Sequence, residues 1–449
     1  MRDMDITEMK GPMLRPGDAR YDDERTGFQA LTAHRPDVVA GVVDADDVRL
    51  AVAYAVAEGL PVAVQATGHG MPVAAEGGLL VSTRRMTGVR VDPDTATARV
   101  EAGVRWSAVI DQAARHGLAP LSGSAPSVGA VSYSLGGGVG LLARRHGYAA
   151  DEVRAVEVVT ADAEARRVTP ESDPGLFWAL VGGRGNFGVV TALEIGLVPV
   201  ASLYGGALFF DADRVDGVLP AWREWTDAVP EEMTSSVALI PFPDAPQVPE
   251  ALRGRRVAHV RIAYAGPAEE GEPLVARLRA LGPALKDTVR VMPYTESGSI
   301  HDDPAGPLAF YATHSLLGDL PPQAAGALEE AAAGHVLEVR HLGGALSRPG
   351  PAANAVGNRD AAFHAGLLSR LAPGADPAPV RPVHERVRAA LSPWSTGGRA
   401  LTFLYGEHAN PEEVRRAYAP DVYRRLAALK AEWDPGNVFR LNHNIPPAR

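Results

Sequence analysis

Residues 129–140 read Gly-Ala-Val-Ser-Tyr-Ser-Leu-Gly-Gly-Gly-Val-Gly. Glycines let a backbone approach a ligand closely, and successive N–H groups can form a concave anion-binding surface. A flexible surface loop would carry glycines too, but Val131, Leu135 and Val139 are spaced through this stretch as packing residues. Because a packed, glycine-rich segment is typical of a cofactor cradle, we predict such a cradle here.

A second glycine cluster, residues 183–188, reads Gly-Arg-Gly-Asn-Phe-Gly and matches the GxGxxG pattern. In a dinucleotide-binding fold this pattern follows a strand and opens a helix, whose N-terminus then meets the pyrophosphate. Here the expected helix 174–181 precedes the pattern, and the β-rich stretch 189–198 follows it. The order is reversed, so we do not predict a Rossmann site.

A histidine lies between two glycines in a third stretch, Ala66-Thr-Gly-His-Gly70, which follows the expected strand 61–66. A lone histidine is more often structural or simply exposed than functional. The local sequence therefore leaves the role of His69 open.

Composition and charge exclude several classes of function. The chain of 449 residues has a net charge of −10, whereas a nucleic-acid-binding surface needs clustered basic residues. The absence of cysteine excludes disulfides and thiolate metal sites and fits a reducing cytoplasm, where we expect the protein. No metal-binding motif is present, and residues 132–136 lack the first glycine of a nucleophile elbow. We therefore expect no metal and no nucleic-acid partner. We also expect no membrane partner, since no apolar run approaches the length of about eighteen residues that a membrane-spanning helix needs.

The pattern of expected elements changes near residue 200. Before it, short strands alternate with helices such as 46–58 around the glycine-rich segments. From about Tyr204, longer strands such as 257–264 alternate with helices such as 267–281. This change predicts a separate α+β domain with an antiparallel sheet covered by helices.

Four separated segments, in family order, together resemble the vanillyl-alcohol-oxidase-type FAD proteins with a PCMH-type flavin domain. Among these the chain is most similar to the berberine-bridge-enzyme-like FAD-linked oxidoreductases. The four segments are residues 61–70, 124–142, 173–190 and 433–446.

The resemblance implies an α+β fold with a two-part PCMH-type FAD-binding domain. Residues 1–200 would form most of that domain, and the C-terminal segment 406–449 would complete it. Residues 201–405 would be an inserted substrate domain, with an antiparallel sheet that is covered by helices. This division agrees with the change of pattern near residue 200.

The resemblance also implies how FAD is held. In the family a histidine at the place of His69 bonds covalently to the flavin, although here Gln65 replaces a usual arginine and Thr67 a usual glycine. A second attachment point, a cysteine in relatives, is Ala125 here, so we expect a single covalent link. The residues expected to contact FAD are Gln65, Ala66, Thr67, Gly68, His69, Gly70, Ser127, Val128, Gly129, Ser132, Gly137, Gly140, Val190, Asn442 and Asn444.

Four residues are candidates for the substrate side. Alternation along the expected strand 336–342 puts Glu338 and Arg340 on one face, which in relatives looks onto substrate; a mutually paired salt bridge is the alternative. Arg340 replaces an acidic residue of amine-oxidising relatives and suits a carboxylate, enolate or phenolate oxygen. Tyr405 falls where relatives place a tyrosine or asparagine above the flavin, as a base or orienting hydroxyl, unless it is an ordinary aromatic of a half-buried strand. Tyr133 falls where plant relatives keep a flavin-contacting histidine.

These features predict an FAD-dependent oxidoreductase that transfers a hydride to flavin N5 from an alcohol, amine or phenol-activated C–H. We expect a small-molecule substrate, such as a specialised metabolite, and O2 as electron acceptor, since Val128 has modest size where the family admits or blocks O2. The missing Tyr-x-Asn-Tyr pattern of the family leaves a redox-neutral cyclisation or rearrangement as the alternative. A binding protein without activity is a third, weaker reading. The sequence does not reveal the substrate's identity or the oligomeric state.

Overall fold

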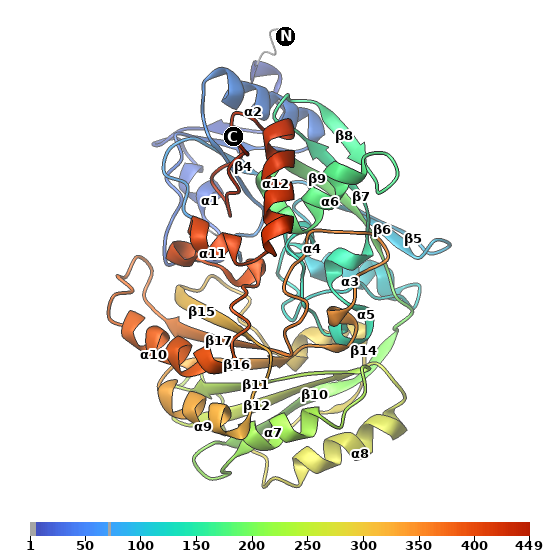
Figure 1. Cartoon of the computed structure of the whole chain (residues 1–449), viewed down its shortest axis with the longest axis vertical. Helices are drawn as coiled ribbons and strands as arrows, with labels where there is room; N and C mark the ends of the chain where they lie inside the picture. The colour runs from blue at the N-terminus through green and yellow to red at the C-terminus, as the bar shows by residue number, and fades with distance from the viewer. Residues whose placement is uncertain (1–5, 71–72) are drawn as a thin grey trace.

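Three β-sheets organise the chain, of which the computed structural model describes residues 6–70 and 73–449. Two smaller sheets come from the first 196 residues and lie in the upper half of Figure 1. The largest sheet comes from residues 202–370 and lies in the lower half. The last helix, drawn in red, runs back beside the first half of the chain.

The first sheet has the strand order β1-β2-β4-β3, with β2, β4 and β3 parallel. Every residue of β2 and β4 is buried, as expected for parallel strands covered on both faces. The helix that joins β2 to β3 is capped by Asp44, whose side chain accepts hydrogen bonds from two backbone amides of its first turn. The elements are β1 (Met13–Leu14), α1 (Tyr21–Arg25), β2 (Val38–Gly41), α2 (Ala45–Ala57), β3 (Val62–Gln65) and β4 (Leu79–Ser82).

The second sheet is antiparallel and has the order β5-β6-β9-β7-β8. Its helices bury large aromatic side chains against it, including Trp106 and Phe177. The elements are β5 (Val89–Asp92), β6 (Thr97–Glu101), α3 (Trp106–Ala114), α4 (Ala130–Leu135), α5 (Ala143–His146), β7 (Val153–Val159), β8 (Ala165–Val168), α6 (Pro174–Gly183) and β9 (Val189–Gly196).

The third sheet has eight antiparallel strands, ordered β13-β10-β12-β11-β16-β17-β15, with β14 also paired to β10. Helices α7, α8 and α9 cover it from below in Figure 1, and Trp222 and Trp225 of α7 are buried in that core. The predicted antiparallel sheet covered by helices is confirmed. The strands are β10 (Ser202–Asp211), β11 (Met233–Pro241), β12 (Arg256–Tyr264), β13 (Lys286–Asp287), β14 (Arg290–Pro293), β15 (Phe310–Leu317), β16 (Val336–His341) and β17 (Phe363–Arg370). The helices are α7 (Val218–Thr226), α8 (Ala268–Arg279), α9 (Pro322–Ala331) and α10 (Arg381–Leu391).

The C-terminal segment packs against the N-terminal half of the chain. After α11 (Pro411–Arg415), helix α12 (Pro420–Trp433) contacts α6, and Val62 N–H of β3 donates to Val438 O over 2.9 Å. Lys430 is fully buried, and its Nζ donates to Asp434 Oδ2 over 2.6 Å. This packing agrees with the proposed two-part domain, whose boundaries at residues 200 and 405 stay predictions.

Two local features differ from the sequence-based expectations. The glycine-rich stretch 129–140 contains the six-residue helix α4, whose buried Val131 and Leu135 attach it to the core. Residues 401–403 form a 3₁₀ turn, so Tyr405 follows a turn and not a strand. Among the helices of the described residues, none has the length and apolar character needed to cross a membrane.

Candidate active site

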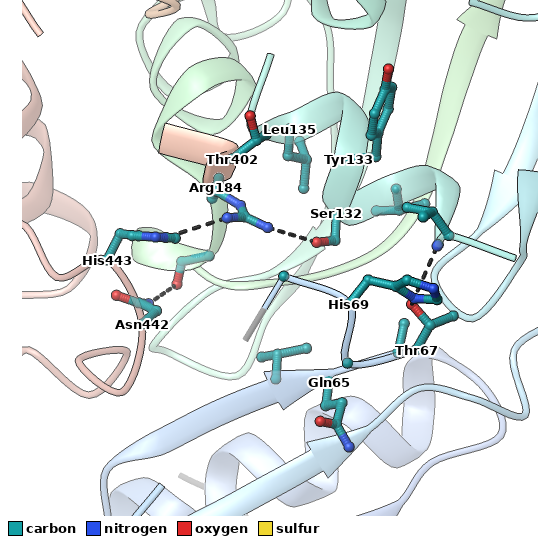
Figure 2. A pocket seen from close by; sticks show the side chains of 18 of the residues that line it. Gln65, Thr67, His69, Ser132, Tyr133, Leu135, Arg184, Thr402, Asn442 and His443 are labelled. Carbon is teal, nitrogen blue, oxygen red and sulfur yellow. Dashed lines mark hydrogen bonds between the residues drawn. The ribbon is translucent and has the colours of Figure 1, made fainter. Parts of the chain in front are cut away.

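A cavity of about 260 Å³ lies where the glycine-rich segments, the third sheet and the C-terminal tail meet (Figure 2). Its walls come from the end of β3 and the following loop, from α4, from the turn after α6, and from Arg340 of β16. The tail contributes Asn442 and His443. Among the described residues that line this cavity there is no Asp or Glu.

His69 lies in the cavity wall with both ring nitrogens next to hydroxyls. Its Nδ1 is 2.9 Å from Thr67 Oγ1, and its Nε2 is 3.2 Å from Ser127 Oγ. Phe28 stacks on the imidazole with ring centroids 3.9 Å apart. Burial, with a smaller effect of Arg105, lowers the pKa of His69 to about 4. The ring is therefore neutral at physiological pH and fixed in orientation.

The loop that carries His69 requires glycine at position 68. Gly68 has a φ of +73°, and a Cβ there would lie 2.6 Å from the Cα of Gly27. The backbones are also joined, because Phe28 N–H donates to Thr67 O over 2.9 Å. This close approach brings Phe28 onto the histidine.

Arg184 lines the cavity without a carboxylate partner among the described residues (Figure 2). It is 9% exposed, and its guanidinium donates to Ser132 Oγ over 2.9 Å and to His443 Nδ1 over 3.3 Å. Its backbone has φ 55° and ψ −140°, a region that residues with a side chain rarely adopt. The sequence showed Arg184 within the second glycine cluster, but not its conformation or its position.

Two histidines fix the segment that carries Tyr405. His443 Nε2–H donates to Leu404 O over 2.9 Å, and Nδ1 of the same ring accepts from Arg184, so the ring is neutral. His314 Nδ1–H donates to Phe403 O over 3.1 Å and its Nε2 accepts from Ala400 N–H over 2.9 Å. Both carbonyls belong to the turn before Tyr405, so the position of Tyr405 depends on two buried rings.

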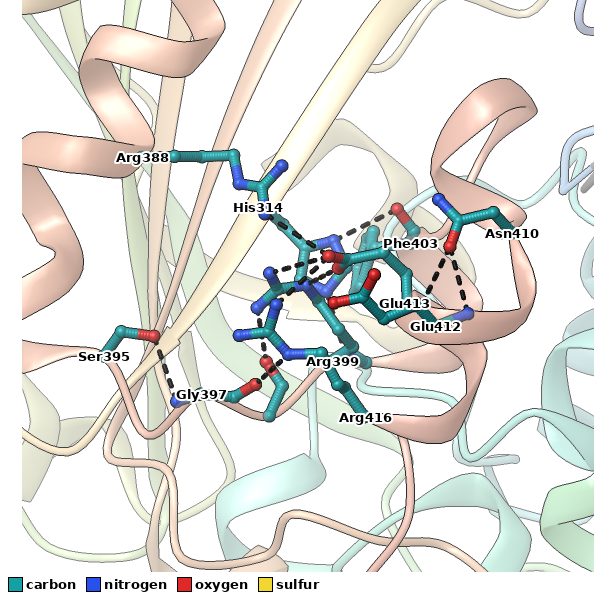
Figure 3. A network of polar contacts seen from close by, with 12 residues as sticks. His314, Arg388, Ser395, Gly397, Arg399, Phe403, Asn410, Glu412, Glu413 and Arg416 are labelled. Atoms are coloured by element: carbon teal, nitrogen blue, oxygen red, sulfur yellow. Dashed lines mark hydrogen bonds and ion pairs between the residues drawn. The ribbon is translucent and has the colours of Figure 1, made fainter. Parts of the chain in front are cut away.

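A charged cluster contacts residues 397–399, which lead into the turn before Tyr405 (Figure 3). Glu413 pairs with three guanidinium groups, of which the one on Arg399 is buried and the closest. Arg416 contacts Glu413 over 3.1 Å, and its Nε donates to Gly397 O over 2.9 Å. This cluster ties residues 397–399 to α11.

Glu338 and Arg340 are partners on β16. Arg340 Nε donates to Glu338 Oε2 over 2.8 Å, and Arg261 of β12 pairs with the other oxygen of the same carboxylate. The two guanidinium groups hold the pKa of Glu338 below its ordinary value although burial acts to raise it. Arg340 lines the cavity and Glu338 does not. The two side chains form a salt bridge, which was the alternative to a role in substrate binding.

Tyr133 and Tyr405 both line the cavity. Burial raises the pKa of Tyr405 to about 12, while Arg184 and Arg340 act to lower it. Burial also raises the pKa of Tyr133, whose ring lies within 2.4 Å of where a Cβ on Gly138 would be. Both phenols are protonated at neutral pH.

The structure brings most of the predicted FAD-contact residues to one cavity. Ser127, Gly137, Gly140 and Asn444 do not line it, although Ser127 contacts His69. Phe28, Arg184 and His443 were not among the residues predicted from the sequence. The predicted residues that line the cavity are Gln65, Ala66, Thr67, Gly68, His69, Gly70, Val128, Gly129, Ser132, Val190 and Asn442.

The cavity has unsatisfied polar groups that suit a flavin. Asn442 Oδ1 and Tyr133 OH in the cavity lining, and Asn444 Oδ1 on the residue after the lining residue His443, are buried and have no hydrogen-bond partner in the described part of the chain. Asn442 is oriented by its own amide, which donates to Gly185 O over 2.8 Å. Buried acceptors of this kind need a donor, and a flavin ring carries an N–H group between two carbonyls. The residues present therefore fit FAD.

Comparison with known proteins agrees with this site. A family model described as FAD binding domain matches residues 36–169, and one described as berberine and berberine like matches residues 405–446. (R)-6-hydroxynicotine oxidase of Paenarthrobacter nicotinovorans is 30% identical over 462 residues, which cover 98% of this chain and 97% of that protein. An uncharacterized FAD-linked oxidoreductase of Bacillus subtilis is 27% identical and covers 99% of both chains.

Solved structures show the same fold. The crystal structure of 6-hydroxy-D-nicotine oxidase from Arthrobacter nicotinovorans matches with a TM-score of 0.84 at 25% identity, covering 98% of both chains. BBE-like 1 of Physcomitrella patens matches with a TM-score of 0.85 at 17% identity, covering 99% of this chain and 98% of that one. The second likeness concerns the fold alone.

Proposed function

Because this chain belongs to the berberine-bridge-enzyme-like FAD-linked oxidoreductases, we propose that it is an oxidase that passes electrons from a small organic metabolite to O2. The proposal rests on the cavity that joins His69, the unsatisfied Asn442 oxygen and Tyr405. Membership of this family already identifies the protein as an FAD-dependent oxidoreductase. A single covalent link through His69 and a cytoplasmic location are parts of the same proposal.

The environment of His69 supports covalent attachment. A neutral imidazole has a lone pair, and the pKa of about 4 keeps His69 in that form. The hydroxyls of Thr67 and Ser127 and the stacked Phe28 hold the ring in one orientation. Attachment would replace the imidazole N–H and one methyl C–H of the flavin with a C–N bond, while O2 takes up two electrons and two protons as H2O2. Ala125 cannot form a second link.

The chain's own residues would bind and orient the substrate. FAD, when bound, supplies the hydride-accepting chemistry. Tyr405 is protonated at neutral pH, so it would serve as a hydrogen-bond donor that orients the substrate and not as a ready base. No carboxylate lines the described cavity. The carboxylate of Glu338, a candidate residue for the substrate side, forms salt bridges with Arg261 and Arg340. This arrangement favours a substrate whose C–H bond needs no strong protein base, such as a neutral amine or a phenolate.

The acceptor can be tested without knowing the substrate. The purified holoprotein is photoreduced under anaerobic conditions and then mixed with air-saturated buffer, and the flavin absorbance is followed. We expect reoxidation within seconds and formation of H2O2 in amounts equal to the flavin. Flavin that stays reduced for minutes would leave a dehydrogenase. Conversion of a substrate into its isomer, without bleaching or peroxide, would favour the redox-neutral alternative.

A further inference from the structure

The described residues that line the cavity carry a net positive charge. Its described lining includes two guanidinium groups, on Arg184 and Arg340, and no carboxylate. The lining histidines do not add charge, because burial lowers the pKa of His69 to about 4 and that of His443 to about 3. Burial also lowers the pKa of His34, the third lining histidine. The lining alone therefore carries two positive charges at neutral pH.

The nearby carboxylates do not neutralise this charge completely. Glu338 is shared between Arg340 and Arg261, so one guanidinium of that triad has no carboxylate of its own. Asp303 is exposed, and its carboxylate accepts a hydrogen bond from Ser124 Oγ over 2.7 Å. Its negative charge also acts to raise the pKa of Arg340. Asp303 forms no ion pair within 4.0 Å among the described residues.

Arg184 has an even less compensated charge. It is nine-tenths buried, and its hydrogen-bond partners are a hydroxyl and a neutral imidazole. An unpaired buried guanidinium destabilises a protein, and so does a strained backbone such as its φ of 55°. A glycine at this place would avoid both costs. The arginine is thus best explained by a negatively charged group that binds in the cavity.

Tyr405 connects the two arginines. Arg184 and Arg340 each act to lower the pKa of the Tyr405 hydroxyl, so this group lies within electrostatic reach of both. The hydroxyl is protonated and can donate to an oxyanion. Arginine and tyrosine donors around one position are suited to bind a carboxylate or phenolate oxygen.

We propose that the substrate of this oxidase carries an anionic oxygen, a carboxylate or a phenolate, which binds between Arg184 and Arg340 beside the Tyr405 hydroxyl. The proposal deepens the oxidase proposal and rests on it, because it takes the part of this cavity beside Arg184, Arg340 and Tyr405 as the substrate site and leaves the part beside His69 and Asn442 to FAD. It also accounts for the missing base, since the negative charge of a phenolate already activates the adjoining C–H bond.

The test compares two probes of nearly equal shape, benzoate and benzamide, by isothermal titration of the oxidised holoprotein at pH 7. We expect benzoate to bind at least about tenfold more tightly than benzamide. R184Q and R340Q should each weaken benzoate binding by about tenfold or more and leave benzamide binding unchanged. R184K and R340K, which keep the positive charge, should recover part of the difference in affinity between benzoate and benzamide. R425Q, which removes an exposed arginine over Trp178, is the matched control.

Three outcomes would overturn the proposal. Equal binding of the two probes would show that the cavity does not select an anion. Loss of benzamide binding together with benzoate in R184Q or R340Q would show that the arginine supports the pocket as a whole and does not select an anion. A lower flavin content in purified R184Q, with unchanged benzoate binding, would assign Arg184 to the cofactor and not to the substrate. The oxidase proposal fails separately, if the reduced flavin does not react with O2.

Discussion

At the scale of single residues, the hydroxyls beside His69 are the most specific feature of the site. Thr67 Oγ1 is 2.9 Å from Nδ1, and it also accepts from Gly129 N–H over 3.3 Å. The hydrogen bond at one ring nitrogen decides which nitrogen carries the proton. Thr67, which replaces a usual glycine of the family, therefore has a physical role in this chain.

We predict that T67V slows covalent attachment of FAD. Loss of the hydroxyl frees the imidazole to rotate and to change tautomer, which we expect to slow attachment by about tenfold. The measurement follows acid-precipitable flavin after FAD is added to apoprotein. S124A is the control, because Ser124 lines the same cavity but bonds Asp303. An unchanged rate in T67V would mean that the hydroxyl does not prepare the histidine.

At the scale of elements, the turn before Tyr405 depends on the ion-pair cluster of Figure 3. We predict that E413Q unfolds at a lower temperature, because it leaves the buried Arg399 without a carboxylate, at a cost of about 3–5 kcal/mol. Binding of benzamide should weaken as well, since Thr402 and Phe403 line the cavity. Calorimetry and titration measure the two effects.

The neighbouring residue provides the control for this prediction. Glu412 is exposed, and the salt bridges of the cluster do not include it. E412Q should therefore match the unmodified protein in both measurements. An E413Q protein that unfolds and binds like E412Q would show that the cluster does not hold the turn.

Elements of the fold were predictable where the apolar pattern is strong. The helix expected at 46–58 is Ala45–Ala57, and the strand expected at 257–264 is Arg256–Tyr264. Helix α4 was missed because its six residues are too few to show a helical period beside so many glycines. Arg184 was missed for a different reason. Its importance comes from the absence of a carboxylate partner among the described residues and from its backbone angles, and neither is visible in a sequence.

At the scale of the whole molecule, buried neutral histidines link stability to pH. Burial lowers the pKa values of His341, His364 and His443 to about 3 each. Since these values lie below the ordinary 6.5, the unfolded chain binds more protons once the pH falls below about 6.5. The stability that these rings contribute is present above that pH and is lost progressively as the pH falls toward the folded values.

We predict that the unfolding temperature falls steadily between pH 7 and pH 5 at constant ionic strength, as followed by scanning calorimetry. His364 has no hydrogen-bond partner on either ring nitrogen within the described chain, so H364L removes one titrating group without breaking a bond. Its unfolding temperature should depend less steeply on pH. H116Q, at an exposed position, should keep the original slope. A constant or rising unfolding temperature on acidification would contradict this account.

The proposed enzyme carries a single FAD that is covalently attached to His69. Mass spectrometry of the denatured holoprotein tests it most directly, followed by digestion and sequencing of the peptide that carries flavin. We expect an added mass of one FAD less two hydrogens, located on His69, absent from H69A and retained in H116A. A denatured holoprotein without added mass, or flavin on another residue, would contradict it.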